Sequence, residues 1–497
     1  MPAASTTSGH RNHPRRVDIV LIRQRQWAIA LAIACHAWAP PGHGQEFHER
    51  LLLVSSASQL AAQSPSVESS EGSRPAVVSQ SQYSPPLLTI EQSVLQAVNW
   101  HPVISESVNE LFQRQQNIRI ARAGYFPQLN AGVIAGHDSE DEGDGNGHAL
   151  QLYASQVIYD FGKVSSGVDL ASAEATRSLA NVLFSVDQVA RQTANAAIEV
   201  QRYQALLGIA RERIDGVQSI ASLVRMRSER GASSRSDLLQ AESRMQAARA
   251  DFQQLEARLA RWRAELQNFV GAEQPFAVSM EATPSLTSAC EAPVSAVTAS
   301  PRVLIAEASR DEAMARLEEA KSDAWPTLSL DANYNRYLDP NYVDANVIDE
   351  NESSVFLNLS MPIYQGGRIS ATKQSSAYAL QAADYAKDAA IETVARDYRS
   401  AQEQERGLAR SLGILEARER SIRETRDLYR KQYSSLGTRT LLDLLNSEQE
   451  LYQARQELSG TRFDLERLRL DCLYNVGALR RAFGIEGRQV QGVQILP

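Results

Sequence analysis

The chain has 497 residues, of which 43% are hydrophobic, and a formal net charge of −8. The negative charge argues against a general nucleic-acid-binding role. No apolar run reaches the roughly 20 residues that a membrane-spanning helix requires, so a membrane role would depend on strands or on an anchor.

The first 86 residues are predicted to precede the folded part of the chain. Residues 1–44 have the pattern of an export signal, because Arg23 and Arg25 precede the apolar stretch 27–35, which is followed by the small-x-small site 37–39. Gly44 offers a second cleavage point, and Cys35 is an alternative site for lipidation. Residues 45–86 are rich in Ser, Gln and Pro, which predicts a flexible leader.

The remaining chain contains an internal duplication. Gly231 is followed six residues later by Asp237, and the same spacing recurs in Gly437 and Asp443. The tripeptide 125–127 likewise recurs at 324–326. One ancestral unit repeated twice explains both matches. We therefore predict a first repeat at 87–271, a linker at 272–300, a second repeat at 301–477 and a tail at 478–497.

Each repeat is predicted to hold two strands joined by an acidic loop. Apolar and polar residues alternate roughly over 127–136 and 149–159, and again over 327–334 and 354–364. Strands of about ten alternating residues with aromatic ends are typical of outer-membrane barrels. Four strands cannot close a barrel alone, whereas three chains would supply twelve.

A soluble hairpin packed on helices, with calcium on its acidic loops, is the alternative. The loops lack the spacing of a calcium-binding loop, so we expect no metal.

Two unusually long helices are predicted. Residues 163–229 lack proline and keep an apolar 4-3 spacing, which is typical of a coiled-coil seam. At 1.5 Å per residue this helix would be about 100 Å long. The second helix runs from about 368 to 434, where Glu405, Glu419 and Arg426 interrupt its seam. Each is followed by a partner helix with the same apolar 4-3 spacing.

Cys472 falls in step with the seam of the last partner helix. The simplest interpretation is a packed free thiol that behaves as a small hydrophobe. An exported chain can also form disulfides, so a Cys290–Cys472 bond is the alternative.

The two turns have helix-capping residues. Gly231 and Gly437 can close the preceding helices in the left-handed conformation. Ser236 with Asp237, and Thr440 with Asp443, would then cap the helices that follow. The sequence shows no glycine-rich phosphate loop and no nucleophile–base pair, so we expect neither an enzyme nor a cofactor.

The order of elements and the second turn resemble the TolC family of outer-membrane channel-tunnels. The most specific match runs from Tyr433 through Gly437 and Asp443 to Leu458, and 88–103 resembles the first helix of that family. The resemblance implies a mainly α fold, in which long helices form a coiled-coil barrel across the periplasm. It also implies four strands per protomer in a trimeric twelve-stranded outer-membrane β-barrel, with linker and tail in an equatorial region.

By the same resemblance, the turns form a gated tip. The gate would use Ser236 and Asp237 against Arg439, with Ser434 at the family's tyrosine position and Tyr433 beside it. Asp443 would form an entrance ring, and Asn446 stands where a second aspartate often lies. The segments that would contact a periplasmic adaptor protein are Arg230, Gly231, Ala232 and Ser233, together with Leu436, Gly437, Thr438 and Arg439.

The resemblance implies a homotrimer in outer-membrane lipid, at the cell outer membrane and extending into the periplasm. An adaptor (membrane fusion) protein would link it to an inner-membrane ABC or proton-driven transporter. Type I protein secretion is the favoured function. Multidrug or metal efflux is the alternative, and a soluble periplasmic coiled-coil scaffold is a more remote one.

Overall fold

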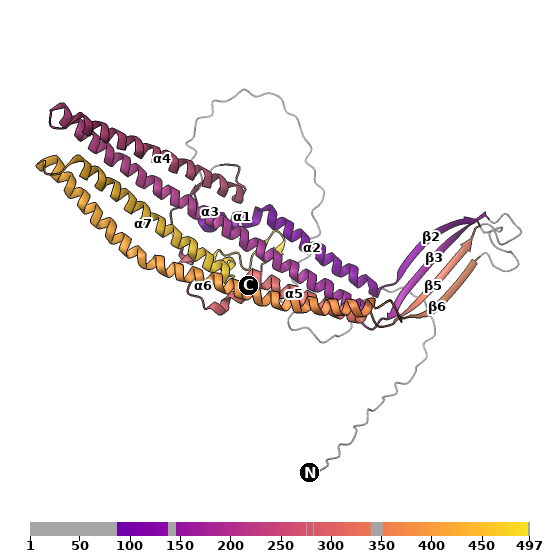
Figure 1. Cartoon of the computed structure of the whole chain (residues 1–497). Coiled ribbons are helices and arrows are strands. Elements are labelled where there is room, and N and C mark those ends of the chain that lie inside the picture. The colour runs from indigo at the N-terminus through magenta and orange to yellow at the C-terminus, as the bar shows by residue number, and fades with distance from the viewer. Residues whose placement is uncertain (1–86, 138–145, 275, 282, 339–350, 496–497) are drawn as a thin grey trace, which may run out of the picture. The chain divides into compact units, whose positions relative to one another are not determined.

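The computed structural model describes residues 87–137, 146–274, 276–281, 283–338 and 351–495. The expected signal peptide, the leader and most of both acidic loops lie outside these residues. Helices dominate the fold, and their order repeats (Figure 1). They are α1 (Ile90–Trp100), α2 (Pro102–Arg122), α3 (Lys163–Glu229), α4 (Arg235–Val270), α5 (Pro301–Ser322), α6 (Arg368–Lys431), α7 (Leu441–Asn475) and α8 (Leu479–Ala482).

The first helices begin at strong local signals. Thr89 and Gln92 form a capping box at the start of α1. Pro102 occupies the first turn of α2, where its missing N–H costs no hydrogen bond. The 67-residue α3 has the predicted bounds. None of the described helices is both long enough and apolar enough to cross a membrane.

Helix α3 lies at the centre of the helical packing. Its first part contacts α2 and α5, and its last part contacts α4 and α7. Helix α6 packs on α5 and then on α7. Within one chain, α2 and α4 therefore form one side of the helical layer, and α6 forms the other (Figure 1).

The predicted seam of α3 is confirmed. Its positions are buried, except that Tyr203, Ile214 and Ala221 are half-buried. In α6 the buried seam is shorter, and the three charged interruptions face partners on α7. The pairs are Glu405–Arg469 at 3.1 Å, Glu419–Arg455 at 2.9 Å and Arg426–Glu448 at 2.9 Å.

Four strands form one antiparallel sheet in the order β2-β3-β5-β6. Strands β2 (Gln128–His137) and β3 (Asn146–Tyr159) come from the first repeat, and β5 (Thr327–Tyr337) and β6 (Asn351–Ser360) from the second. The pairing of β3 with β5 joins the two repeats. Strand β6 ends at Ser360, before the 364 that we expected, and Pro362 follows its end. In the described chain, β2 and β6 are the open edges.

The two faces of the sheet differ in polarity. Antiparallel partners share a face, so the register places the side chains of alternate residues together. One face carries Leu129, Val133, Leu152, Leu330, Val355, Leu357 and Leu359. The other is largely polar and centres on Asp331, whose carboxylate accepts hydrogen bonds from Ser155 at 2.6 Å, Ser329 at 3.1 Å and Asn358 at 3.3 Å.

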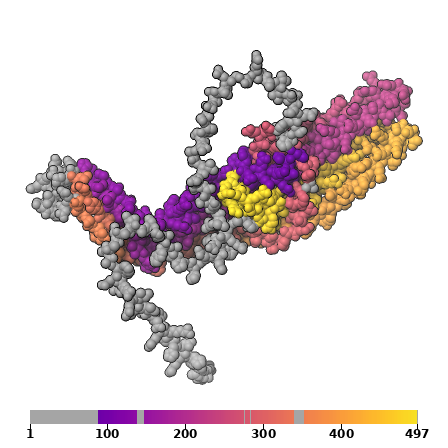
Figure 2. Space-filling model, turned by 180° about the vertical axis from the view of Figure 1, so that it is seen from behind, coloured from indigo at the N-terminus to yellow at the C-terminus, as the bar shows by residue number. Residues whose placement is uncertain are grey.

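The linker and the tail pack around the middle of the long helices. Strand β4 (Ala277–Val278) of the linker pairs with β1 (Leu87–Leu88), and the short helices η2 (Pro284–Leu286) and η3 (Val294–Ala299) follow it. In the tail, β7 (Gln489–Val490) pairs with β8 (Val493–Gln494). The Gln491 side chain donates to the carbonyls of Val98 and His101, both at 3.3 Å. Figure 2 shows α1 beside this C-terminal segment.

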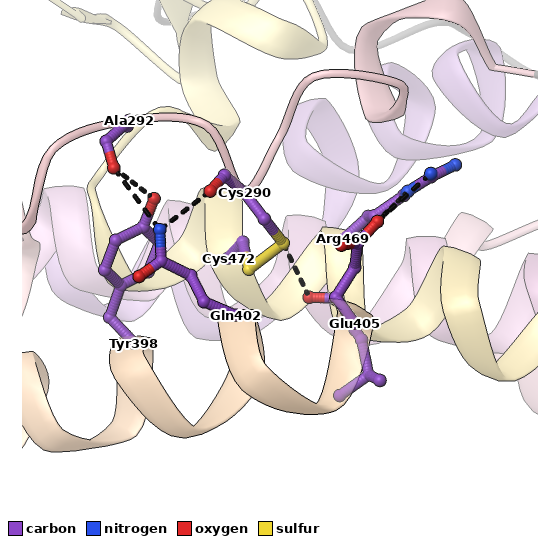
Figure 3. The surroundings of a disulfide bond; sticks show 8 residues. Cys290, Ala292, Tyr398, Gln402, Glu405, Arg469 and Cys472 are labelled. Atoms are coloured by element: carbon purple, nitrogen blue, oxygen red, sulfur yellow. Dashed lines mark hydrogen bonds and ion pairs between the residues drawn. A yellow bond between two sulfur atoms is a disulfide. The ribbon is translucent and has the colours of Figure 1, made fainter. Parts of the chain in front are cut away.

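The expectation of a free thiol at Cys472 is wrong. Cys472 is fully buried, as its seam position predicts, but it forms a disulfide with Cys290 (Figure 3). The linker reaches α7 because Leu286, Ala289 and Val297 are buried in the main core. It is also held by α6, where the Tyr398 hydroxyl donates to the Ala292 carbonyl at 2.8 Å and the Gln402 amide donates to the Cys290 carbonyl at 2.8 Å.

Candidate functional site at the helical tip

The two turns end their helices as the glycines predict. Gly231, with a φ of 73°, follows α3, and Gly437, with a φ of 64°, follows α6. Both φ values lie in the left-handed region that favours glycine. Before Gly437 the chain widens into a π-helical turn at Gln432–Leu436. Such turns often occur at functional sites.

Both aspartates of the duplicated motif belong to capping boxes. The Ser234 hydroxyl accepts from the Asp237 N–H at 3.1 Å, and the Asp237 carboxylate accepts from the Ser234 N–H at 3.2 Å. Thr440 and Asp443 repeat this exchange at 3.2 and 3.4 Å. Helix α4 therefore begins at Arg235, and Ser236 is not the cap that we expected. Ser236 lies in the first turn, with its hydroxyl 2.7 Å from that of Ser234.

The predicted gate residues Asp237 and Arg439 do not meet within one chain in the described contacts. The Arg439 guanidinium donates to Gln432 at 3.0 Å, lies 3.9 Å from Asp443 and stacks over the Tyr429 ring at 4.4 Å. These contacts all belong to the second hairpin, and those of Asp237 belong to the first. A direct Asp237–Arg439 latch between the two turns stays a prediction.

Tyr433 is the predicted gate residue that joins the two turns. Its hydroxyl lies 3.4 Å from that of Ser233, and its carbonyl accepts from the Arg227 guanidinium at 3.1 Å. The same guanidinium lies 4.9 Å from the centre of the Tyr433 ring. Neighbouring Ser434, by contrast, is exposed and donates to the Lys431 carbonyl at 3.5 Å.

Arg227 was missed by the sequence reasoning. The sequence shows Arg227 only as a basic residue in the last turn of α3. Basic residues are common at helix C-termini, so this position alone does not indicate which residue Arg227 contacts. A further contact between the hairpins joins Arg430 of α6 to the Ser219 hydroxyl of α3.

A small apolar cluster, separate from the main core, supports these contacts. It buries Ile220, Val224, Ala241, Tyr433, Leu441, Leu444 and Leu445, which come from both hairpins. The tip thus has packing of its own. Tyr433 is the polar member of this cluster, and only 5% of its surface is exposed.

The predicted entrance-ring residues differ in exposure. Asp443 is half-buried and takes part in the capping box, and Asn446 is exposed one turn further along α7. The Asn446 side-chain oxygen accepts from Arg244 of α4 at 3.4 Å. Asn446 thus adds another link between the hairpins.

The segments predicted to contact an adaptor form an open surface. All are exposed except Ser233, which is half-buried. Leu436 has 69% of its surface exposed. Further exposed apolar side chains surround the turns, namely Met226, Leu239, Leu428 and Leu442. Exposed apolar side chains at the turns are available for contact with another protein.

The described residues also show what the tip does not contain. Their His, Cys, Asp and Glu side chains form no group of three or more that could hold a metal ion. The chemistry of the tip is therefore that of capped helix ends, cation–aromatic contacts and hydrogen bonds between hairpins. Such contacts hold two helical hairpins together when they form, and the hairpins can separate when they break.

Comparison with known proteins agrees with this architecture. The family described as outer membrane efflux protein matches residues 95–272 and again residues 292–469, one match in each repeat. The outer membrane protein TolC of Vibrio cholerae is 29% identical over 191 residues, which are 38% of this chain and 41% of that protein. The alkaline protease secretion protein AprF of Pseudomonas aeruginosa is 29% identical over 31% of this chain and 32% of its own.

A solved structure shares most of the fold. The outer membrane protein VceC of Vibrio cholerae has a TM-score of 0.68 at 17% identity, and the alignment covers 78% of this chain and 96% of that one. The alignments with TolC and AprF span less than half of each relative. With a family match in both repeats, the chain belongs to the outer membrane efflux protein family, and it is located in the cell outer membrane and extends into the periplasm.

Proposed function

We propose that this chain is one protomer of a homotrimeric outer-membrane channel that carries substrates across the periplasm and out of the cell. The two-faced sheet is the observation that carries the proposal. Its apolar face is exposed, its other face is polar, and both edges are open. An open edge cannot face lipid, because its backbone groups would lack hydrogen-bond partners. Three copies joined edge to edge form a twelve-stranded barrel.

The helices support the same assembly. Helix α3 has 67 residues and would extend about 100 Å from the sheet. The side formed by α2 and α4 and the opposite side formed by α6 are left for neighbouring copies. The tunnel continues the barrel and ends at the tip.

The tip is the docking site for the transport partners in this proposal. The exposed apolar residues around the turns bind a periplasmic adaptor (membrane fusion) protein. The adaptor connects the channel to an inner-membrane ABC or proton-driven transporter, which supplies the energy. Docking opens the tip by separating the two hairpins, a population shift that requires stronger adaptor binding to the open state.

Type I protein secretion is the favoured use of the channel. The relative AprF is named an alkaline protease secretion protein, which supports secretion. Multidrug or metal efflux is the second candidate, because the family model describes efflux proteins. A deletion strain separates the two uses. We expect it to lose one or more exported proteins from the culture medium while its sensitivity to toxic small molecules stays unchanged. The reverse result assigns efflux.

The assembly is tested independently of the substrate. Membrane fractionation should recover the protein with the outer membrane, and unheated gel samples should run as a trimer that heating converts to monomer. A soluble monomer in the periplasmic fraction overturns the proposal and favours a coiled-coil scaffold.

A further inference from the structure

The helical tip carries a positive charge, although the chain as a whole is negative. Segments 223–241 and 425–447 contain the two turns with seven residues of helix on either side. They hold eight Lys or Arg and four Asp or Glu, which gives a net charge of +4, against −8 for the whole chain. Three further residues along each helix leave the sum positive, at +2. The excess of positive charge therefore lies at the very end of the hairpins.

Three of the four carboxylates in these segments already have partners. Asp237 and Asp443 accept hydrogen bonds from the backbone of Ser234 and Thr440 in their capping boxes. Asp427 lies 2.9 Å from the guanidinium of its neighbour in sequence, Arg426. These carboxylates have little capacity left to neutralise other cations of the tip.

Three cations of the tip have no carboxylate partner. Arg230 and Arg235 of the first hairpin and Lys431 of the second are exposed, and none forms an ion pair with a residue that the structure describes. The helix dipoles do not compensate for them. Each turn joins the negative C-terminal end of one helix to the positive N-terminal end of the next, so the two end charges cancel.

Neighbouring copies cannot supply the missing negative charge. In the proposed barrel the three copies stand side by side with their helices parallel, so each tip meets two identical tips. The charges of identical parts add, and three tips of +4 have a net charge of +12 whichever ion pairs form between them. The positive charge is therefore a property of the assembly and not only of an isolated protomer.

This charge acts on the mouth of the channel from either side of the helices. A helix with its side chains is about 10–12 Å wide, and at 0.1 M salt charges are screened over about 10 Å. A cation on the outer side of a hairpin thus still acts on an ion that passes the inner side. One unit charge at about 10 Å changes the local concentration of a small ion by about twofold in water, before screening.

We propose that the tip makes this channel selective for anions, so that its substrates carry net negative charge where they enter. The inference rests on the proposed channel function and adds the charge class of the substrate. Anionic substrates are concentrated at the tip by its positive potential, and cationic substrates are repelled from it.

Reversal potentials of the purified full-length trimer in planar bilayers test this selectivity. KCl is present at about 0.1 M on one side and about 0.01 M on the other, where charges are screened over about 10 and 30 Å. We expect chloride to permeate at least about threefold better than potassium. With about 1 M salt the screening length falls to about 3 Å, and the preference should largely disappear.

Charge reversal at the unpaired cations locates the effect. Arg230→Glu/Arg235→Glu/Lys431→Glu changes the tip from +4 to −2 per protomer, so the channel should now prefer potassium. Arg230→Lys/Arg235→Lys/Lys431→Arg keeps the charges and should keep the preference for chloride. If the glutamate variant forms no trimer, the single variants Arg235→Glu and Lys431→Glu replace it, and each should lower the ratio of chloride to potassium permeability.

A matched control reverses three cations far from the tip. Arg258 and Arg263 of α4 and Arg399 of α6 are exposed and form no ion pair within the described chain. Each lies more than about 30 Å along its helix from the turn, at 1.5 Å per residue. The variant Arg258→Glu/Arg263→Glu/Arg399→Glu should therefore keep the preference for chloride.

Two results would overturn the proposal. One is an unmodified channel that prefers potassium or neither ion, in which case the positive tip would fit an acidic surface of a docking protein instead. The other is an unchanged preference in the glutamate variants, which would place the selectivity elsewhere in the tunnel. Failure of the channel function is seen separately, as a protein that forms neither a heat-modifiable trimer nor channels in the bilayer.

Discussion

Tyr433 shows how single residues hold the tip together. It is buried, it lies in a π-helical turn, and both its hydroxyl and its carbonyl contact the first hairpin. Arg227 supplies a charged hydrogen bond and a cation–π contact to the same residue. Such contacts are each worth about 1 kcal/mol or more, so a few of them can bias a tip between closed and open states.

The first prediction concerns this contact. Replacing Arg227 with Ala should raise single-channel conductance in planar bilayers, because Tyr433 loses its charged partner on the first hairpin. The variant Asp237→Ala/Arg439→Ala should also raise conductance if those residues form the predicted latch between the turns. Arg225→Ala is the matched control, since the Arg225–Glu242 ion pair stays within one hairpin. Unchanged conductance in either test variant counts against the contact that it removes.

Asp187 is a buried carboxyl group in the middle of the molecule. It is fully buried on α3, and one of its oxygens lies 2.6 Å from Arg480 of α8. The other oxygen has no hydrogen-bond partner among the described residues. Burial raises the pKa of Asp187 to about 7, and the charge of Arg480 opposes this increase.

The second prediction is a pH dependence. The folded state binds a proton at Asp187 more tightly than the unfolded chain does, so stability should fall as the pH rises from about 4 to 7. The size of this effect is on the order of a few kcal/mol. Asp187→Asn keeps an acceptor for Arg480 and should flatten this part of the profile in denaturant unfolding of the solubilised protein. Asp464→Asn, on the more exposed surface of α7, should not. An unchanged slope in Asp187→Asn would contradict the assignment.

The hairpin formed by α6 and α7 differs as an element from that formed by α3 and α4. Its seam contains ion pairs where the first hairpin has mostly apolar contacts. Glu419 is 5% exposed and receives hydrogen bonds from Arg455 at 2.9 Å and from Arg423 at 2.5 Å. Burial opposes ionisation of Glu419, but these hydrogen bonds lower its pKa overall. Buried pairs of this kind fix the register of two helices better than they stabilise them.

The third prediction tests whether the Glu419–Arg455 pair stabilises the protein through its charges or through its packing. Arg455→Leu should destabilise the protein by about 3 kcal/mol, because Glu419 keeps its charge and loses a partner. The double variant Glu419→Leu/Arg455→Leu should recover most of that loss, as measured by chemical unfolding. If the double variant is as unstable as the single one, the pair contributes through packing and not through its charges.

At the scale of the whole molecule, the disulfide connects the linker between the repeats to the end of the second one. Cys290 and Cys472 are separated by 182 residues, which include α5, the second strand pair and the α6–α7 hairpin. A crosslink over such a long loop restricts the unfolded chain strongly. The chain-entropy model gives about 5 kcal/mol for a loop of this length.

The fourth prediction follows from this connectivity. Cys290→Ala/Cys472→Ala should lower the thermal unfolding midpoint of the trimer, and a reducing agent should lower that of the unmodified protein by a similar amount. The reducing agent should have no further effect on the double variant, which is the internal control. Equal midpoints for all samples would show that the linker is held by Tyr398, Gln402 and the core alone.

Local patterns predicted most of the elements. The bounds of α3 and the glycines of both turns follow from helix periodicity, the lack of proline and the left-handed preference of glycine. The four strands were also predicted, with shifts of a few residues at their ends. The predicted helix cap was wrong where two nearby residues could both serve as the cap. Both Ser234 and Ser236 can cap a helix, and only the formed capping box shows that Ser234 does so.

The sequence by itself determined the duplication, the long helices and the position of the turns, because each depends on residues close together in the chain. The tertiary structure decided which distant groups meet. It joined β3 to β5, Cys290 to Cys472, the α6 charges to α7, and Arg227 to Tyr433. For each of these groups the sequence contains several residues that could serve as the partner. The packing of the long helices determines which of them lies within contact distance. A one-residue change of register would bring different side chains together.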